Sequence, residues 1–194
     1  MADGRWLMAI LFCPHKATIR HLLFAIRHPP SATMLLYLIR HGLATWSHWG
    51  GPDNERPLTP EGARLIEAEG AALACLGLQP AWILHSPLQR ARQTAELIAE
   101  ALNRSDQLRA SELLRPGFDP NTLKQLLRQY PIVESLMLVG HAPDMGEVTR
   151  ALTGGQVKFK EGAVACVQIE KPETDSQGVL LWLAVAEMLI LLER

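Results

Sequence analysis

Met34-Leu35-Leu36-Tyr37-Leu38-Ile39 is an unbroken apolar run, and Arg40-His41-Gly42 follows it directly. A run of this length and composition is typical of a strand that is buried on both faces of a parallel sheet. Ligands of open α/β proteins bind beyond the carboxyl ends of the strands, so Arg40 and His41 lie where such proteins usually have their active site. Arginine offers a planar fork for anions, and histidine can act as a nucleophile or proton carrier.

Two later segments repeat this arrangement of an apolar run followed by a polar turn. Ser135–Val139 leads into Gly140-His141, and Trp82–His85 leads into Ser86-Pro87. Parallel strands of one sheet end at the same edge, so we expect His41 and His141 to lie close together although they are far apart in the chain.

The segment from Pro87 to about Leu102 predicts a helix, with Ser86 as its cap and Pro87 in its first turn. Arg90 then lies near the start of this helix and faces the strand ends. Helix N-termini attract anions, so an arginine at this place indicates an anion site. We interpret Arg92, two residues further on, as a solvated charge that points elsewhere.

The rest of the chain alternates between strand and helix patterns after a first strand at 34–40. Thr59 is expected to cap a helix that begins at Pro60. Alternation of this kind indicates an α/β fold, here a single three-layer domain whose mostly parallel sheet has helices on both faces. The other expected elements are a strand at 81–85, helices at 121–129 and 143–152, a strand at 135–139, and strands at 163–169 and 179–186 that form a hairpin.

Composition limits the classes of partner and compartment. The chain has 194 residues, a formal net charge of -1 and 20% charged residues, which gives no long-range attraction to nucleic acid or to an anionic membrane. Cys13, Cys75 and Cys166 are widely spaced, which favours neither a disulfide framework nor a zinc site and fits a reducing compartment such as the cytoplasm. The seven histidines also lack the spacing of metal ligands, so we expect neither a metal nor another cofactor.

Three motifs in this order and spacing resemble the histidine phosphatase superfamily, also called phosphoglycerate mutase-like. They are L-I-R-H-G at 38–42, S-P-L-Q-R-A-R-Q-T-A at 86–95 and V-G-H-A-P-D at 139–144. The short chain and R-P-L-T-P-E-G at 56–62 resemble the small SixA-type phosphohistidine phosphatases of that superfamily. The resemblance extends from about Met34 to the C-terminus and implies a phosphoglycerate mutase-like fold.

The resemblance also implies roles for four residues. His41 matches the family's nucleophile, which carries the phosphoryl group as a phosphohistidine intermediate. Arg40, Arg90 and His141 match the residues that bind the phosphoryl oxygens. For attack on phosphorus one ring nitrogen of His41 must be neutral, and we expect a backbone carbonyl near Gly42 to hold the other as a donor.

The general acid is less evident in the sequence. Larger members of the superfamily carry a glutamate in a Trp-Glu-Gly motif that is absent here, where Ser111-Glu112-Leu113 stands instead. Glu112 is either a proton donor or a surface carboxylate, and Asp144 is a second candidate for which helix capping is the simpler interpretation. Ser47 stands where the mutases often have asparagine.

We therefore expect an enzyme that hydrolyses phosphohistidine in a protein such as a phosphorelay domain. A phosphoramidate has an activated P–N bond, so a weak acid slows its hydrolysis less than that of an alkyl phosphate ester. The alternatives are a small-molecule phosphomonoesterase acting on a sugar or nucleotide phosphate, and a non-catalytic phosphate-binding module. We expect a monomer without nucleic-acid or membrane partners.

The first 33 residues differ from this pattern. They contain an apolar octet, Trp6–Cys13, and four basic residues against one acidic residue. The octet is too short for a membrane span, and no small-residue cleavage site follows it. We expect 1–33 to be a disordered extension or to precede a true translation start at Met34, and 34–194 to form the phosphatase domain.

Overall fold

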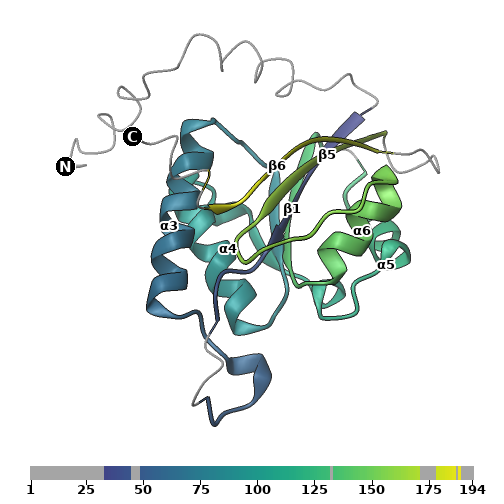
Figure 1. Ribbon diagram of the computed structural model, residues 1–194. Coiled ribbons are helices and arrows are strands. Elements are labelled where there is room, and N and C mark those ends of the chain that lie inside the picture. The colour runs from purple at the N-terminus through teal and green to yellow at the C-terminus, as the bar shows by residue number, and fades with distance from the viewer. Residues whose placement is uncertain (1–32, 45–48, 132, 171–177, 187, 189–194) are drawn as a thin grey trace.

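A computed structural model describes residues 33–44, 49–131, 133–170, 178–186 and 188 of the protein. Within this part a six-stranded sheet has the order β3-β2-β4-β1-β5-β6 (Figure 1). Strands β3, β2, β4 and β1 pair in parallel, whereas β5 is antiparallel to both β1 and β6. The predicted mostly parallel sheet and its late hairpin are confirmed. The strands are β1 Thr33–Arg40, β2 Trp82–His85, β3 Leu108–Ala110, β4 Ser135–Gly140, β5 Val164–Glu170 and β6 Val179–Ala184.

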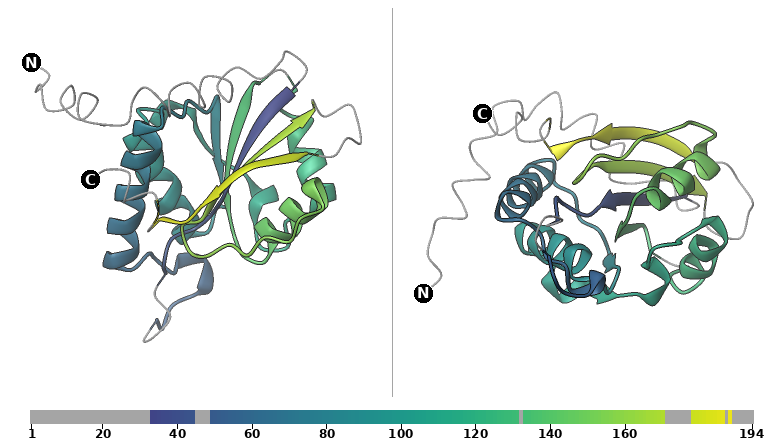
Figure 2. Two further views of the ribbon diagram at one scale, coloured as in Figure 1. Left: turned by 45° about the horizontal axis from the view of Figure 1, so that its top comes forward. Right: turned by 60° about the horizontal axis from the view of Figure 1, so that its bottom comes forward.

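Helices cover both faces of this sheet (Figure 2, left). Helices α3 (Pro60–Cys75) and α4 (Gln89–Ala101) lie on one face, and α5 (Pro120–Leu127) and α6 (Asp144–Thr153) lie on the other. The three-layer α/β prediction is therefore confirmed. Short 3-10 helices also occur at η1 Asp53–Glu55, η2 Ser105–Gln107 and η3 Glu112–Leu114.

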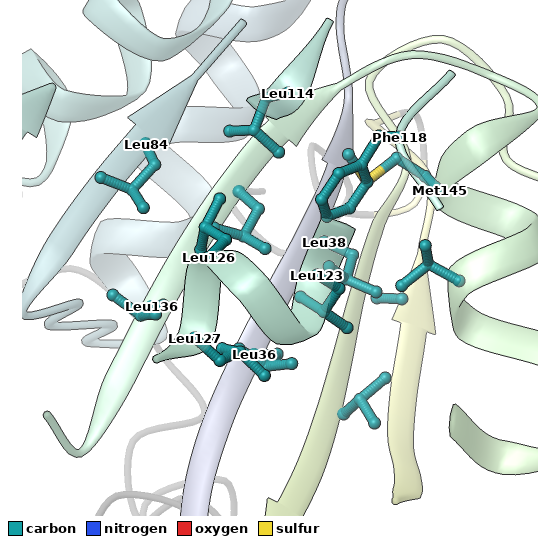
Figure 3. Close-up of a cluster of buried hydrophobic side chains, with 14 of the residues drawn as sticks. Leu36, Leu38, Leu84, Leu114, Phe118, Leu123, Leu126, Leu127, Leu136 and Met145 are labelled. Carbon is teal, nitrogen blue, oxygen red and sulfur yellow. The ribbon is translucent and has the colours of Figure 1, made fainter. Parts of the chain in front are cut away.

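The two central strands contribute side chains to both layers. In β1, Leu36 and Leu38 belong to the cluster on the α5–α6 side, while Tyr37 and Ile39 belong to the cluster on the α3–α4 side. Because both faces are buried, such a strand has an unbroken apolar sequence. Figure 3 shows the first cluster, in which α5 packs against β1, β2 and β4 through Leu123, Leu126 and Leu127.

The register of the parallel strands determines which residues meet at the carboxyl edge. Arg40 of β1 is paired with Gly140 of β4, and His85 of β2 is paired with Val139. The next residue along each of the three strands therefore emerges at the same edge of the sheet. This register brings together the turns that begin at His41, Ser86 and His141.

Several local predictions are tested by the structure. Thr59 caps α3, because its Oγ1 accepts the Gly62 N–H at 2.9 Å, as expected. The prediction that α4 begins at Pro87 with Ser86 as its cap is wrong, since Pro87 precedes Leu88, whose extended backbone (φ -66°, ψ 136°) forms the N-cap. The edge strand β3 was not expected, because only three residues pair there.

Some expectations concern residues outside the described part of the chain. These are the predicted extension up to residue 32 and the departure at Ser47. Thr33, the last residue of the predicted extension, is instead the first residue of β1. Among the described residues, no helix has the length and apolar character needed to span a bilayer.

Candidate active site

His41 follows the last residue of β1, and hydrogen bonds to the end of β4 and to the turn before β5 hold its backbone in place. Its N–H donates to the Gly140 carbonyl at 3.0 Å, and its carbonyl accepts the Gly162 N–H at 3.3 Å. Gly162 has a φ of +72°, a conformation that favours glycine, and it precedes β5 by two residues. The central strands thus extend their pairing as far as the imidazole-bearing residue.

Two contacts determine the tautomer of the His41 ring. Nδ1 lies 2.8 Å from the carbonyl oxygen of Gly42, which can only accept, so Nδ1 carries the hydrogen. The guanidinium of Arg90 donates its Nε–H to His41 Nε2 at 3.2 Å, so Nε2 has a free electron pair. The carbonyl contact at Gly42 agrees with the expectation from the sequence.

Arg90 is the second residue of α4 and has 4% of its surface exposed. Thr94, one turn further along, joins this helix to the turn after β1. Its hydroxyl donates to the Arg90 carbonyl at 2.8 Å and accepts the Gly42 N–H at 3.1 Å. A buried threonine therefore fixes the distance between the helix that carries Arg90 and the turn that carries His41.

His141 follows β4 and completes the cluster. Its ring centroid lies 5.2 Å from that of His41, with an interplanar angle of 64°. Its Nε2 lies 2.9 Å from the hydroxyl of Ser86, the first residue after β2. His141 Nδ1 is buried, and no described residue forms a hydrogen bond with it. The Ser86 side chain, expected to cap a helix, thus contacts the second histidine.

Arg40 lies beside this cluster and makes its own contacts. Its Nη1 donates to the Phe159 carbonyl at 2.9 Å, and its Nη2 forms an ion pair with Glu161 at 2.6 Å. The structure therefore brings His41, Arg90 and His141 into one cluster and places Arg40 at its edge. Arg40 also lines a cavity of about 550 Å³, whose charged lining further includes Glu147, Arg150 and Lys158.

Burial and neighbouring positive charge keep both histidines neutral. Burial lowers the pKa of His41 to about 4, the charges of Arg90, Arg40 and Arg56 act in the same direction, and the hydrogen bond to Gly42 opposes them. Burial, followed by the proximity of His41 and Arg90, lowers the pKa of His141 to about 3. Both rings are therefore uncharged at neutral pH.

Two further charged residues belong to the site and were not among the candidates from the sequence. Asp53 in η1 accepts hydrogen bonds from Arg90 through its backbone oxygen at 2.8 Å and through Oδ2 at 3.1 Å. Its Oδ1 lies 2.9 Å from Nη2 of Arg56, which is 4% exposed. Burial lowers the pKa of Arg90, and the charge of Asp53 opposes this effect. Asp53 and Arg56 are three residues apart in the sequence and lie just ahead of the predicted helix. Two opposite charges at this spacing could have indicated that they form an ion pair.

The two candidate acids are engaged elsewhere. Glu112 is exposed and forms an ion pair with Arg115 at 2.6 Å. Asp144 is 8% exposed, and its Oδ2 accepts the backbone N–H groups of Gly117 and Phe118 at 2.8 and 3.2 Å. The interpretation of Asp144 as a helix cap is wrong, because it is the first residue of α6 and holds the 117–118 segment instead.

Arg92 agrees with its interpretation as a solvated charge. It is half-exposed and pairs with Glu96 one turn further along α4 at 3.8 Å. In the described part of the chain, no three His, Cys, Asp or Glu side chains form a group that could hold a metal ion.

Comparison with known proteins identifies the family of this site. A model of the histidine phosphatase superfamily, branch 1, matches residues 36–115, which include His41 and Arg90. An uncharacterized protein of Picosynechococcus sp. is 37% identical over 125 residues, covering 63% of this chain and 75% of that protein. The chain belongs to the histidine phosphatase superfamily. It is therefore a hydrolase that removes phosphate from phosphorylated substrates.

The similar proteins whose names state an activity include a protein histidine phosphatase and a serine/threonine-protein phosphatase. The structure of the protein histidine phosphatase SixA complexed with tungstate superposes with a TM-score of 0.72 at 26% identity, covering 80% of this chain and 99% of that chain. The mitochondrial serine/threonine-protein phosphatase PGAM5 of Xenopus tropicalis is 35% identical over 95 residues, which are 46% of this chain. The match covers only 34% of that protein's length.

Proposed function

We propose that the protein is a phosphohistidine phosphatase that removes phosphate from a histidine side chain of a phosphorylated protein. The observation that carries this proposal is the likeness to SixA, in which 99% of the solved chain has a counterpart here. Because nearly all of the SixA chain aligns with this protein, we expect segments of similar length around the active sites of both proteins. A site of this kind can admit a side chain that projects from a folded partner.

In this mechanism Nε2 of His41 attacks the phosphorus atom. A bond forms between Nε2 and phosphorus, and the bond between phosphorus and the substrate nitrogen breaks with its electron pair staying on that nitrogen. A substrate ring that carries a proton on its other nitrogen thereby leaves as neutral imidazole, without a proton from the enzyme. The hydrogen bond from Nδ1 to the Gly42 carbonyl stabilises the charge that develops on the His41 ring. Water then attacks the phosphoenzyme, releases inorganic phosphate and restores neutral His41.

Positive and polar groups would stabilise the charge on the transferred group. Arg90 already donates toward Nε2 of His41, so it is placed to donate to an oxygen of a phosphoryl group bound there. His141, whose ring centroid lies 5.2 Å from that of His41, and Arg40, at the edge of the cluster, would supply further donors. Phosphoryl transfer needs mainly such positioning and charge stabilisation from a protein.

Both candidate acids are bound to other groups, which favours a substrate with a P–N bond over a phosphate ester. The Glu112 carboxylate pairs with Arg115, and that of Asp144 is occupied by two backbone N–H groups. An alkyl alcohol is a poor leaving group without a proton, whereas imidazole leaves phosphorus readily. We propose a phosphorelay-type domain as the substrate, and a monomer acting in the cytoplasm, which fits the wide spacing of the three cysteines in the sequence.

One observation favours a second candidate, a small-molecule phosphomonoesterase. The cavity of about 550 Å³ next to Arg40 has the volume of a site for a small organic ligand. Arg150 and Lys158 in its lining could bind a polar group of a sugar or nucleotide phosphate.

Hydrolysis by the purified full chain distinguishes the two candidates. A phosphohistidine-bearing phosphorelay domain and a panel of sugar, nucleotide and aryl phosphates are compared by release of inorganic phosphate. We expect the highest kcat/KM on phosphohistidine, no turnover by His41→Ala, and acid-labile phosphate trapped on His41 of the wild type. Faster turnover of a sugar phosphate would favour the second candidate, and label on another residue would contradict the mechanism.

A further inference from the structure

A single carboxylate connects two buried guanidinium groups beside His41. Asp53 Oδ2 lies 3.1 Å from Nη2 of Arg90, and Oδ1 lies 2.9 Å from Nη2 of Arg56. Both arginines have 4% of their surface exposed, whereas the Asp53 side chain is 60% exposed. The anion thus approaches from the solvent side, and the cations lie beneath it.

The carboxylate occupies donors that a bound phosphoryl group requires. Arg90 directs Nε–H to His41 Nε2, Nη1 to the Asp53 backbone oxygen and Nη2 to the Asp53 carboxylate. Nε and Nη2 form the edge of a guanidinium that can bind two oxygens of one anion. A phosphoryl group at His41 Nε2 can use both donors only when the Asp53 carboxylate leaves Nη2.

The charges favour such an exchange. Arg90 and Arg56 carry two positive charges and Asp53 one negative charge, while Arg40 is already balanced by Glu161. A phosphoryl group brings a charge of about -2, which balances the two guanidinium groups without Asp53. With Asp53 still in place, the two guanidinium groups, the carboxylate and the phosphoryl group would together carry a net charge of about -1.

We propose that Asp53 is an internal anion that occupies the phosphate site in the resting enzyme and gives up Nη2 of Arg90 to the substrate. This proposal rests on the proposed binding of phosphate at His41. Asp53 thereby determines the affinity for phosphate, because each binding event must first break its ion pair with Arg90. The bond from Arg90 to the Asp53 backbone oxygen does not depend on the side chain and keeps the arginine oriented.

The test measures binding of tungstate to the full chain by isothermal titration calorimetry at fixed ionic strength. Asp53→Asn removes the competing charge at nearly constant shape, so its Kd for tungstate should fall about five- to tenfold. Asp53→Glu keeps the charge and should bind tungstate like the wild type. Glu55→Gln is the matched control, since it removes an exposed carboxylate from the same 3-10 helix and should change Kd by less than about twofold.

Steady-state kinetics distinguish competition between Asp53 and phosphate from other roles of Asp53. Under the proposal, Asp53→Asn lowers KM in proportion to its Kd for tungstate and does not raise it. Weaker or unchanged tungstate binding by Asp53→Asn would overturn the proposal and identify Asp53 as a residue that positions Arg90. Selective loss of ester hydrolysis would overturn it in favour of a proton donor. Because tungstate binding requires no turnover, a wild type that ignores phosphohistidine would contradict the proposed substrate and leave this test unaffected.

Discussion

Arg90 donates its Nε–H to Nε2 of His41 across 3.2 Å, so the guanidinium lies against the atom with the free electron pair. The bond holds the ring in the orientation that the Gly42 carbonyl also favours. It keeps the buried imidazole neutral as well, because a second hydrogen on Nε2 would face a positive charge. Under the proposed mechanism, one arginine orients the nucleophile and later binds the phosphoryl group that the nucleophile receives.

Arg90→Lys should lower kcat by about 10² to 10³, the typical loss for one transition-state donor. Lysine keeps the charge but has a single ammonium group, which cannot contact both His41 and Asp53 as the three guanidinium nitrogens do. Steady-state kinetics on phosphohistidine would measure the loss. Arg92→Lys, on the exposed side of the same helix, should remain within about twofold of the wild type. Equal effects of the two changes would show that Arg90 contributes only surface charge.

The activity should extend to acidic pH, because the pKa of His41 is lowered from 6.5 to about 4. We expect kcat/KM on an aryl phosphate ester, which survives acid, to show no loss from His41 between pH 8 and about 5 and to fall near pH 4, because kcat/KM reports groups of the free enzyme. A fall centred near 6.5 would show that the His41 ring has an ordinary pKa.

Stability should follow the same titrations. The folded pKa values of His41 and His141 lie below the unfolded value of 6.5, so the unfolded chain binds more protons between pH 6.5 and about 4. The free energy of unfolding should therefore be highest above pH 6.5 and decrease as the pH falls through this window. Urea unfolding across this range would measure the slope, which His41→Asn should reduce.

The strand ends could be predicted from the sequence, because a strand buried on both faces has an unmistakable apolar run. Leu35 to Ile39 and Leu136 to Val139 are such runs, and the residues that follow them had to share an edge. The histidine cluster follows directly from that pattern.

The residues that complete the site were harder to predict, for two reasons. Asp53 and Arg56 belong to a segment between β1 and α3 without periodicity, and their partner Arg90 is distant in sequence. Ser86 has the residue type of a helix cap, but the extended Leu88 delays the helix and leaves its hydroxyl to His141. Local preference indicated the wrong partner, and tertiary packing determined the actual one.

Glu112→Gln should leave the hydrolysis of both phosphohistidine and alkyl phosphate esters nearly unchanged. The Glu112 carboxylate is exposed and pairs with Arg115, so it is a surface group. Esters should be poor substrates of the wild type as well, because an alkyl leaving group needs a proton that this carboxylate does not supply. Parallel assays on a phosphohistidine peptide and a sugar phosphate would test this. A high activity on the sugar phosphate that Glu112→Gln abolishes would favour the phosphomonoesterase alternative.

Ser86→Ala should lower kcat by up to about 10² while KM changes little. The Ser86 oxygen receives the Leu88 N–H, so its own hydrogen is available to Nε2 of His141. A neutral ring that accepts at Nε2 carries its hydrogen on the buried Nδ1, the form that can donate to a phosphoryl oxygen.

Ser135→Ala is the matched control, because Ser135 is also buried but begins β4 at the opposite edge of the sheet. Both changes remove one buried hydroxyl and should cost about 1 kcal/mol of stability, measured by urea unfolding. Equal kcat values for the two variants would mean that Ser86 supports the fold and does not orient His141.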